Sequence, residues 1–372
     1  MAERTQADGE GEHDAGREIH GRTKPRTAWE VKALVRSRRP RYTPRVSSLR
    51  VAVIAGGPST EAEVSRESAR GVHAALARKG HSATLFELEP ALGSRLLAER
   101  FDVVFPVTHG AVGEDGCLQG LLEVLGLPYV GSGVLASALA ASKPHAKMLF
   151  AAAGLPIVPG ETIELGVDLA TRVPALRARL GPAFVVKPAC GGSAIGVEVV
   201  GAPASDLDAV SAVERVLLVE PLALVERFAP GLEVTCGALE QGAELEALPP
   251  TWIRPRAAAH YDFVSKYRAG GSEHVCPAPF APELVASIQR AALAAHRALG
   301  CRDLSRTDFV VDPGSESFVL LEVNTLPGMT AVSLFPEAAA VLGISFEALC
   351  DGLARRAAAR PRVAPPRAPP MP

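Results

Sequence analysis

An uninterrupted apolar run that ends in two glycines does most to limit the folds open to this chain. Val51 to Ala55 is wholly apolar and Gly56-Gly57 follows it, which is typical of a buried parallel strand entering a glycine turn. Residues 61–78 then show helical spacing, and strands are expected at 83–88 and 101–107 with a helix between them. This alternation of strand and helix indicates a parallel sheet in an α/β lobe, which we place over residues 50–142.

The rest of the chain shows mainly antiparallel signals. Helices are expected over residues 143–153, ending at Gly154, and over 282–299. Strand pairs are expected at 183–187 with 195–200, at 222–228 with 233–239 around Pro230-Gly231, and at 309–312 with 318–323 around Pro313-Gly314. We divide this part into a central lobe over residues 143–224 and a C-terminal lobe over 225–360.

The two ends of the chain differ from this body. Residues 1–49 have few apolar side chains and a basic stretch from Arg17 to Arg50, and residues 361–372 are rich in Pro and Ala. Both are expected to be disordered. For the basic extension three interpretations stay open: a solvated tail, an arm that contacts nucleic acid or an anionic membrane, and a start codon placed too early, with a true start near Val46.

Composition argues for a cytoplasmic protein that acts on small molecules. The 372 residues carry a formal net charge of -2, which argues against a nucleic-acid-binding surface over the whole chain. The six cysteines include no C-x-x-C pair and are expected to be reduced thiols. The first residues lack the apolar stretch of a signal peptide, and no run reaches the length of a membrane span. We therefore expect neither nucleic acid nor membrane as a partner.

Three oxygen-bearing side chains at the 309–323 strand pair predict a metal site. Asp308 lies near the start of one strand, and Glu322 and Asn324 lie two residues apart on the next. Side chains at i and i+2 of a strand face the same way, so two adjacent strands can direct all three toward one point. Oxygen donors together with phosphate are what Mg²⁺ prefers. The alternative is a surface hairpin, which the apolar residues around Glu322 disfavour.

A lysine and a glycine-rich loop predict a phosphate site. Lys187 ends an apolar strand and is followed by Gly191-Gly192-Ser193. Backbone N–H groups of such a loop can cover phosphates while the lysine adds a positive charge, although the segment lacks the G-K-[ST] of a P-loop. Glu226 and Glu233 flank the next turn, where a glutamate at a strand end could bind ribose; an exposed acid is the equal alternative.

Two glycine-containing segments follow strands of the first lobe. In the first, Ser59 or Thr60 could cap the next helix, whose N-terminus favours a carboxylate, and Glu61 could pair with an ammonium group. The alternative is a capping box without a ligand. In the second, His109 precedes a glycine at the carboxyl end of a strand, which is a better position for a binding site than an isolated histidine usually has.

Read in order, these segments resemble the D-alanine–D-alanine ligases of the ATP-grasp superfamily. The resemblance runs from Val51 to Ala358 and rests on six motifs in the family's order: GGPSTEAEVS, THGAVGEDGCLQG, GLPYVGSGVLASA, VKPACGGSAIG, SKYRAGGSEHVCPAP and LLEVNTLPGMT. It implies an α/β fold of three domains, an N-terminal parallel-sheet lobe followed by two ATP-grasp lobes. It also implies D-alanine and ATP as substrates, and a homodimer.

The resemblance implies a role for each matching residue. Lys143 and Lys187 would hold phosphates, Lys266 the γ-phosphate and Glu233 the ribose, while Glu226, Arg227, Phe228 and Ala229 would line the adenine pocket. Asp308, Glu322 and Asn324 would bind two Mg²⁺ ions, for which Mn²⁺ can substitute; activation by K⁺ is left open. Glu61, connected with Ser193 and Tyr267, would bind the ammonium group of the first D-alanine, with His109 in the same substrate site. Ser333 and Leu334 would bind the second D-alanine.

The implied reaction phosphorylates the carboxylate of the first D-alanine and transfers the acyl group to the amine of the second. Arg306 and the N–H of Gly328 would stabilise the oxyanion. The dipeptide product would feed peptidoglycan synthesis. Tyr267 favours D-alanine as the nucleophile over D-lactate.

Six residues at four sites depart from the family pattern. Ala194 stands where a second serine is frequent, Cys190-Gly191 replaces bulkier polar residues, Ala331-Val332 replaces Ser-His before Ser333, and Ser142 replaces the usual Asp before Lys143. No metal ligand or phosphate lysine is lost. The changes leave two alternatives open: a ligase with another second substrate, and a nucleotide-binding paralogue without catalysis.

Overall fold

The computed structural model describes residues 48–192, 194–255 and 271–360. The chain divides into two units, residues 1–46 and residues 47–372. The description below concerns the second unit alone. Within the described residues no helix is both long and apolar enough to cross a membrane.

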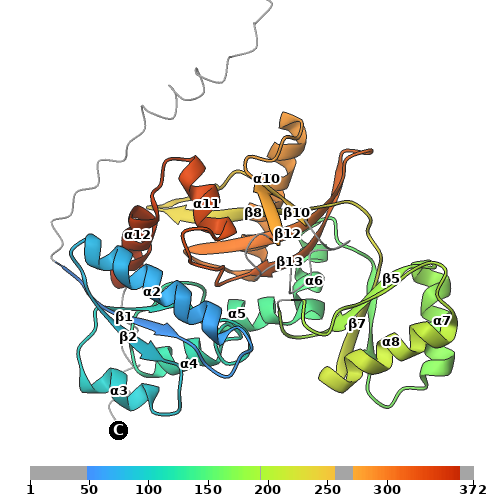
Figure 1. Ribbon diagram of the computed structural model, residues 1–372, viewed down its shortest axis with the longest axis horizontal. Helices are drawn as coiled ribbons and strands as arrows, with labels where there is room; N and C mark the ends of the chain where they lie inside the picture. Colours follow the sequence, from blue (N-terminus) through green and yellow to red (C-terminus); the bar gives the residue numbers. More distant parts are fainter. Residues whose placement is uncertain (1–47, 193, 256–270, 361–372) are drawn as a thin grey trace, which may run out of the picture. The chain divides into compact units, whose positions relative to one another are not determined.

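The N-terminal lobe holds a three-stranded parallel sheet in the order β2-β1-β3. Its strands are β1 (Arg50–Ala55), β2 (Ser82–Glu87) and β3 (Val103–Pro106), and its helices are α2 (Ala62–Arg78), α3 (Leu92–Ala98), α4 (Cys117–Val124) and α5 (Val134–Ala141). The parallel sheet expected from the apolar run and the glycine turn is confirmed (Figure 1).

Alternate side chains of β1 enter two different apolar cores. Val51 and Val53 pack with α2 on one face of the sheet, whereas Ala52 and Ile54 pack with α3 and α4 on the other. The first of these cores also contains Leu349 and Leu353 of α12 (Phe346–Ala358), the last helix described. Figure 1 shows α12 lying against α2. The N-terminal sheet is therefore covered on one face by the C-terminal end of the body.

The central lobe holds an antiparallel sheet in the order β4-β7-β5-β6. Its elements are α6 (Lys143–Ala152), β4 (Gly160–Glu164), α7 (Leu169–Leu180), β5 (Phe184–Pro188), β6 (Glu198–Val200), α8 (Asp206–Val219) and β7 (Leu222–Arg227). Helices α7 and α8 cover one face through a core that includes Val186 and Val225. Lys187 and Glu226, which are next to these residues in sequence, therefore lie on the opposite face.

The C-terminal lobe holds a six-stranded sheet in the order β11-β10-β8-β12-β13, with β9 paired to β8. Its elements are β8 (Leu232–Gln241), β9 (Glu244–Ala247), β10 (Thr251–Pro255), β11 (Ser272–Val275), α10 (Pro282–Leu299), β12 (Leu304–Asp312), β13 (Ser317–Asn324) and α11 (Leu334–Val341). Helices α10 and α6 pack on one face against Phe309, Val311 and Leu320. The alternate residues of β12, Arg306 and Asp308 among them, occupy the other face of the sheet.

The strand pair expected around Pro230-Gly231 is wrong. Strand β7 pairs with β4 and β5, whereas β8 pairs with β9, β10 and β12. The turn residues carry the chain from one sheet to the other. Gly231 has a φ of 155°, and a Cβ there would lie 2.4 Å from the Val311 carbonyl oxygen. The glycine is explained by this close approach and not by a hairpin turn. The expected lobe boundary at 224/225 falls inside β7, and the three-lobe division remains a proposal.

Candidate active site

Strands β8, β12 and β13 bring the expected metal ligands to one face of the C-terminal sheet. Asp308 is paired with Glu322 across the two strands, and Arg306 with Asn324. Cross-strand partners share a face of the sheet, and residues 306 and 308 are separated by one residue. A register shift after Asp308 does not disturb this part of the pairing. The strand pair that the sequence predicted is thus confirmed, although β12 begins at Leu304 instead of near residue 309.

The carboxylate of Asp308 is held by three hydrogen bonds. Arg306 donates Nε to Oδ1 and a terminal nitrogen to Oδ2, both at 2.9 Å, and Thr235 donates its hydroxyl to Oδ1 at 2.7 Å. Thr235 is buried on β8 directly opposite Asp308. We did not predict Thr235 from the sequence. The signal that could have found it is its position two residues after Glu233, on the same face of the strand.

The three side chains fit a magnesium ion. They supply two carboxylates and one amide oxygen, and Asn324 uses Oδ1 to accept the N–H of Leu326 at 2.8 Å, which fixes its orientation. Among the described residues no group of three or more His, Cys, Asp or Glu side chains could hold a metal. The set of Asp308, Glu322 and Asn324 has only two carboxylates, and it suits Mg²⁺ that is bound partly by phosphate oxygens. Mg²⁺ is usually held by one or two carboxylates together with substrate phosphates.

Three buried lysines approach these strands from the central lobe. Lys143 donates to the carbonyl oxygen of Gly191 at 2.5 Å, Lys187 lies 2.5 Å from Glu226, and Lys147 forms a second ion pair with Glu226. Lys143 and Lys147 are one helical turn apart on α6, so both side chains lie on one face of the helix. This i, i+4 spacing is the signal by which Lys147, which we did not predict, could have been found.

Burial and the neighbouring charges shift the pKa values of this cluster. Burial lowers the pKa of Lys143, and the carboxylate of Glu322 opposes that shift. Burial also lowers the pKa of Lys147. Burial by itself would raise the pKa of Glu226, but Lys187 and Lys147 outweigh it and the pKa is lowered. Two lysines therefore face the single ionised carboxylate of Glu226, and cationic side chains of this kind suit bound phosphates.

The segment expected to line an adenine pocket has its side chains on both faces of β7. The Glu226 side chain lies on the face with Lys187, whereas Arg227 donates Nε to the carbonyl oxygen of Leu180 at 3.0 Å, at the end of α7. Phe228 and Ala229 follow in the connection to β8, and Glu233 lies on β8 opposite Val310. A cavity of about 580 Å³ beside Lys147 is lined by residues of α6 and β4 and by the apolar connection between them, residues 157–159.

The first lobe brings its two predicted segments together. Glu61 is buried immediately before α2. A Cβ on Gly110 would lie 2.6 Å from the Ser59 hydroxyl and 4.0 Å from the Glu61 carboxylate, so the loop after His109 passes directly beside Glu61. Nδ1 of His109 lies 3.9 Å from the Glu114 carboxylate. Ser65 joins the two strand ends, because its hydroxyl accepts from Gly56 N and donates to the carbonyl oxygen of Val107.

The two residues expected at the second substrate also lie together. Ser333 precedes α11, and its hydroxyl lies 2.7 Å from that of Thr330. A Cβ on Gly328 would lie 3.0 Å from the Ser333 hydroxyl, so these residues form one turn, with Leu334 buried behind it. Ser193, Lys266 and Tyr267 lie outside the described residues.

Val112 in the loop beside Glu61 has a φ of 69°, a conformation in which a β-branched residue is strained. We expect Val112→Gly to raise the free energy of unfolding by about 1 kcal/mol, because relief of a left-handed conformation exceeds the entropic cost of glycine. Urea denaturation measures it. Val167→Gly is the matched control, since Val167 is similarly exposed but has no positive φ; it should destabilise. If the free energy of unfolding changes in the same direction in both variants, the strain at Val112 is contradicted.

Comparison with known proteins agrees with this geometry. The pattern described as "D-ala D-ala ligase C-terminus" matches residues 149–355, and that described as "D-ala D-ala ligase N-terminus" matches residues 91–132. A D-alanine–D-alanine ligase of Gluconobacter oxydans is 43% identical over 316 residues, which are 84% of this chain and 100% of the relative. The chain belongs to the D-alanine–D-alanine ligase family. The expected family is thereby confirmed, and so is the expectation that the chain is a ligase.

Solved structures of the family share the fold. The D-alanine–D-alanine ligase of Bacillus anthracis, complexed with ATP, superposes with a TM-score of 0.70 at 28% identity. The match covers 84% of this chain and 97% of the Bacillus anthracis chain. The VanG D-Ala:D-Ser ligase of Enterococcus faecalis gives a TM-score of 0.69 at 29% identity, over 82% and 98%. The expected α/β fold of this family is confirmed. Fold likeness does not discriminate between the second substrates named for these two proteins.

Proposed function

We propose that this protein joins two D-alanines to D-alanyl-D-alanine, using ATP and Mg²⁺, in the synthesis of cell-wall precursors. The observation that carries the proposal is the face shared by Asp308, Glu322 and Asn324, where the Glu322 carboxylate is close enough to act on the buried Lys143 of the central lobe. Family membership supports the choice of D-alanine. A cytoplasmic location and a homodimer remain predictions.

The nucleotide is proposed to lie between the central sheet and the C-terminal sheet. Lys143 and Lys187 contact its phosphates and Glu233 its ribose, while Glu226 and the following residues line the adenine pocket. The carboxylate of Glu226 now pairs with Lys187, so part of this ion pair is exchanged for contacts with the nucleotide. Mg²⁺ held by Asp308, Glu322 and Asn324 supplies charge neutralisation at the crowded phosphate oxygens.

The chain's own residues account for the remaining needs of the reaction. Glu61 holds the ammonium group of the first D-alanine, whose carboxylate attacks the γ-phosphate; the bond from the γ-phosphorus to the bridging oxygen breaks, ADP leaves and an acyl phosphate remains. The amine of the second D-alanine, positioned by Ser333, then attacks the acyl carbon and phosphate leaves. Arg306 and the Gly328 N–H stabilise the negative charge on the carbonyl oxygen; loss of one such donor costs about 10²–10³ in rate. Arg306 is already oriented by its paired contact with Asp308.

Incubation with ATP, Mg²⁺ and D-alanine tests the proposal. We expect release of phosphate and ADP together with a product of the mass of the D,D-dipeptide. A mixture of D-alanine with D-serine and D-lactate tests the second substrate, for which Ala331-Val332 leaves the other candidates open. Absence of phosphate release across a broad panel of amino acids, with ATP still bound, would show a nucleotide-binding protein without ligase activity.

Thr235→Val is expected to raise the Mg²⁺ concentration needed for half-maximal activity about 10- to 100-fold, the range found when a partner of a metal ligand is removed. The reason is that the Thr235 hydroxyl fixes Oδ1 of Asp308. Titration with Mn²⁺ in the presence of a non-hydrolysable ATP analogue measures the affinity without turnover. Thr307→Val is the control, because the buried Thr307 hydroxyl has no hydrogen-bond partner in the described part of the chain. Equal affinities for the two variants would exclude this role.

A further inference from the structure

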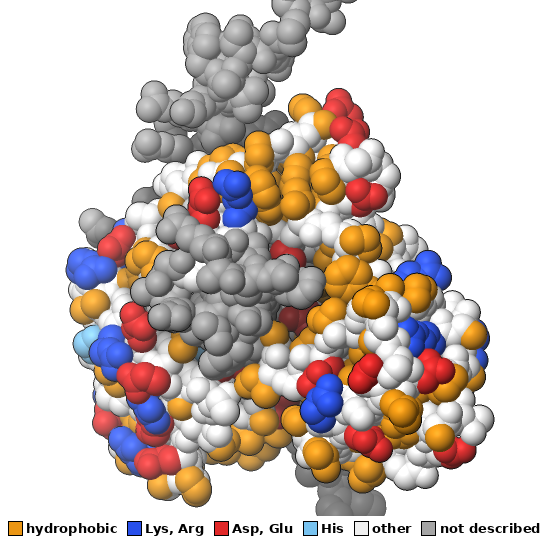
Figure 2. Space-filling view, turned by 45° about the vertical axis from the view of Figure 1, so that its right-hand side comes forward, with side chains coloured by type: hydrophobic (Ala, Val, Ile, Leu, Met, Phe, Trp, Pro, Cys, Tyr) orange, Lys and Arg blue, Asp and Glu red, His pale blue; other side chains and the backbone are white. Residues whose placement is uncertain are grey.

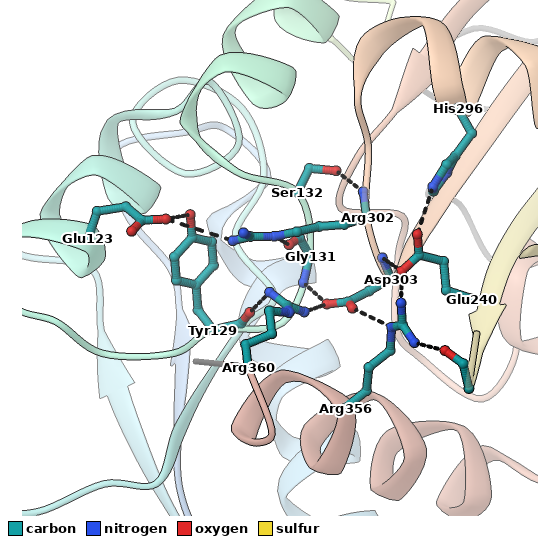
Figure 3. A network of polar contacts seen from close by, with 11 residues as sticks. Glu123, Tyr129, Gly131, Ser132, Glu240, His296, Arg302, Asp303, Arg356 and Arg360 are labelled. Carbon is teal, nitrogen blue, oxygen red and sulfur yellow. Dashed lines mark hydrogen bonds and ion pairs between the residues drawn. The ribbon is translucent and has the colours of Figure 1, made fainter. Parts of the chain in front are cut away.

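A buried aspartate begins the strand that carries Arg306 and Asp308. Asp303 is 0% exposed and directly precedes β12. Its carboxylate accepts the N–H of Gly131 at 2.7 Å and Nε of Arg356 at 3.1 Å, and it forms a further ion pair with Arg360 (Figure 3). Its partners thus come from the N-terminal lobe on one side and from the C-terminal end of the body on the other.

Arginines of the C-terminal lobe also bond the segment that includes Gly131. Arg360 donates to the carbonyl oxygen of Tyr129 at 2.8 Å, and Arg302 donates Nε to that of Gly131 at 2.8 Å. The Arg302 guanidinium also lies over the Tyr129 ring, 4.8 Å from its centroid. Three backbone groups of the segment, the N–H and carbonyl of Gly131 and the carbonyl of Tyr129, are therefore bonded by C-terminal residues, as Figure 3 shows.

A second carboxylate balances the arginines. Glu240 accepts the backbone N–H of Asp303 at 3.1 Å and pairs with Arg356. The neighbouring His296 ring, the Asp303 N–H and Arg356 lower the pKa of Glu240 to about 2, so it stays ionised at neutral pH. The two carboxylates are matched by two arginines, Arg356 of α12 and Arg360 just after that helix, and buried ion pairs are held in one geometry when their charges are matched in this way.

The backbone conformation of Asp303 indicates that its carboxylate is required at this position. Asp303 has a φ of 63°, which L-residues adopt rarely and glycine adopts easily. An aspartate at this position is explained by its three bonds and not by the conformation. Strained residues of this kind are enriched where geometry serves function.

The place of the segment in the N-terminal lobe connects it to the first-substrate residues. Tyr129 bridges to Val104, and Val130 N donates to the carbonyl oxygen of Val104, so the segment extends the sheet beside β3. Strand β3 leads directly to His109, whose loop passes beside Glu61. Asp303 thus lies between the sheet that presents the first substrate and the strand that carries Arg306.

We propose that Asp303 is a positioning residue, which fixes β12 against the N-terminal sheet so that the first D-alanine is aligned with the reacting groups on β12. The inference rests on the proposed function and deepens it. Glu226 pairs with Lys187 and with Lys147 in the central lobe, away from this network, so nucleotide binding should depend on it little. Misplacement of reacting groups by about 1 Å can cost about 10² in rate.

Asp303→Gly tests the proposal, because glycine keeps the backbone conformation and removes the carboxylate. We expect kcat/KM for D-alanine to fall about 10- to 100-fold, with the Kd of a non-hydrolysable ATP analogue within about 2-fold of wild type. Asp303→Asn keeps the shape of the side chain and loses its charge. Its kcat/KM for D-alanine should lie between those of wild type and Asp303→Gly. Asp312→Asn at the exposed other end of β12 is the control and should match wild type.

Hydrogen exchange of residues 128–133 gives a readout that needs no turnover. The proposal expects faster exchange of this peptide in both Asp303 variants and not in Asp312→Asn. It is overturned if Asp303→Gly folds and keeps kcat/KM for D-alanine within about 2-fold, or if nucleotide affinity falls in the same proportion as activity. If Asp303→Gly does not fold, the same two criteria apply to Asp303→Asn. A wild-type protein that makes no dipeptide overturns the proposed function instead, while the exchange experiment still reports on the contact.

Discussion

Glu322→Gln is expected to lower kcat at least about 10³-fold. The substitution keeps the shape of the side chain and removes the negative charge of a residue that lies opposite Asp308 on the neighbouring strand. Metal ions contribute several kcal/mol of charge stabilisation in phosphoryl transfer, and each 1.36 kcal/mol corresponds to a factor of ten in rate. Weaker metal binding should appear as a large drop in ADP formation at saturating ATP and D-alanine, with partial recovery as Mg²⁺ is raised.

Glu244→Gln is the matched control for this variant. Glu244 lies exposed on β9, in the same sheet, and undergoes the same chemical change. We expect it to retain wild-type activity and Mg²⁺ dependence. Wild-type activity in Glu322→Gln would mean that the shared face of β12 and β13 does not bind the metal, and the proposed function would lose its main support.

Lys147→Met is expected to lower the free energy of unfolding by about 3 kcal/mol, because it breaks one of the two buried ion pairs that stabilise the Glu226 carboxylate. Glu226 is 2% exposed and is held by Lys147 and Lys187. The double variant with Glu226→Gln should cost less than the two single changes added together, since it leaves no uncompensated carboxylate. Urea denaturation of all four members of the cycle measures the coupling.

The effect of Lys147→Met should depend on pH with a definite sign. The two lysines hold the pKa of Glu226 below its ordinary value of 4.5 in the folded protein. Such a group stabilises the fold above the unfolded-state pKa, and this stabilisation is lost as pH falls through the folded-state pKa. The deficit of the variant should therefore be full at pH 7 and shrink below pH of about 4.5.

The exposed Lys79→Met, at the end of α2, serves as the control for this series and should change stability by less than about 0.5 kcal/mol. A deficit in Lys147→Met that stays constant from pH 7 to acid pH would show that lost packing, and not the charge of Glu226, causes it.

Sequence patterns were informative where function depends on residues that are near one another along the chain. Asp308, Glu322 and Asn324 could be placed on neighbouring strands because strand alternation and one turn, Pro313-Gly314, define their relation. The parallel sheet of the first lobe followed from its apolar strand and glycine turn for the same reason. Surface charges follow no such local rule. Figure 2 shows acidic and basic side chains interspersed over the face that it presents.

The sequence was less informative where partners are distant. Pro230-Gly231 is a strong turn signal, yet the strands on either side have other partners, and pairing between distant strands leaves no local mark. Thr235 gains its role only from the strand opposite it. Asp303 is an ordinary polar residue in the sequence and becomes notable only through its contacts with Gly131 and Arg360. Spacing along the chain could have pointed to Lys147, four residues after Lys143, and to Thr235, two residues after Glu233.

The core that β1 shares with α12 has a consequence for synthesis of the protein. During translation the N-terminal strands leave the ribosome first, but one face of their sheet is completed by side chains such as Leu349 and Leu353. Domains that can fold alone usually do so as they emerge. Here the earliest segment must wait for the latest, with an apolar surface exposed in the meantime, and a nascent chain that stops before α12 is a natural substrate for chaperones and proteases.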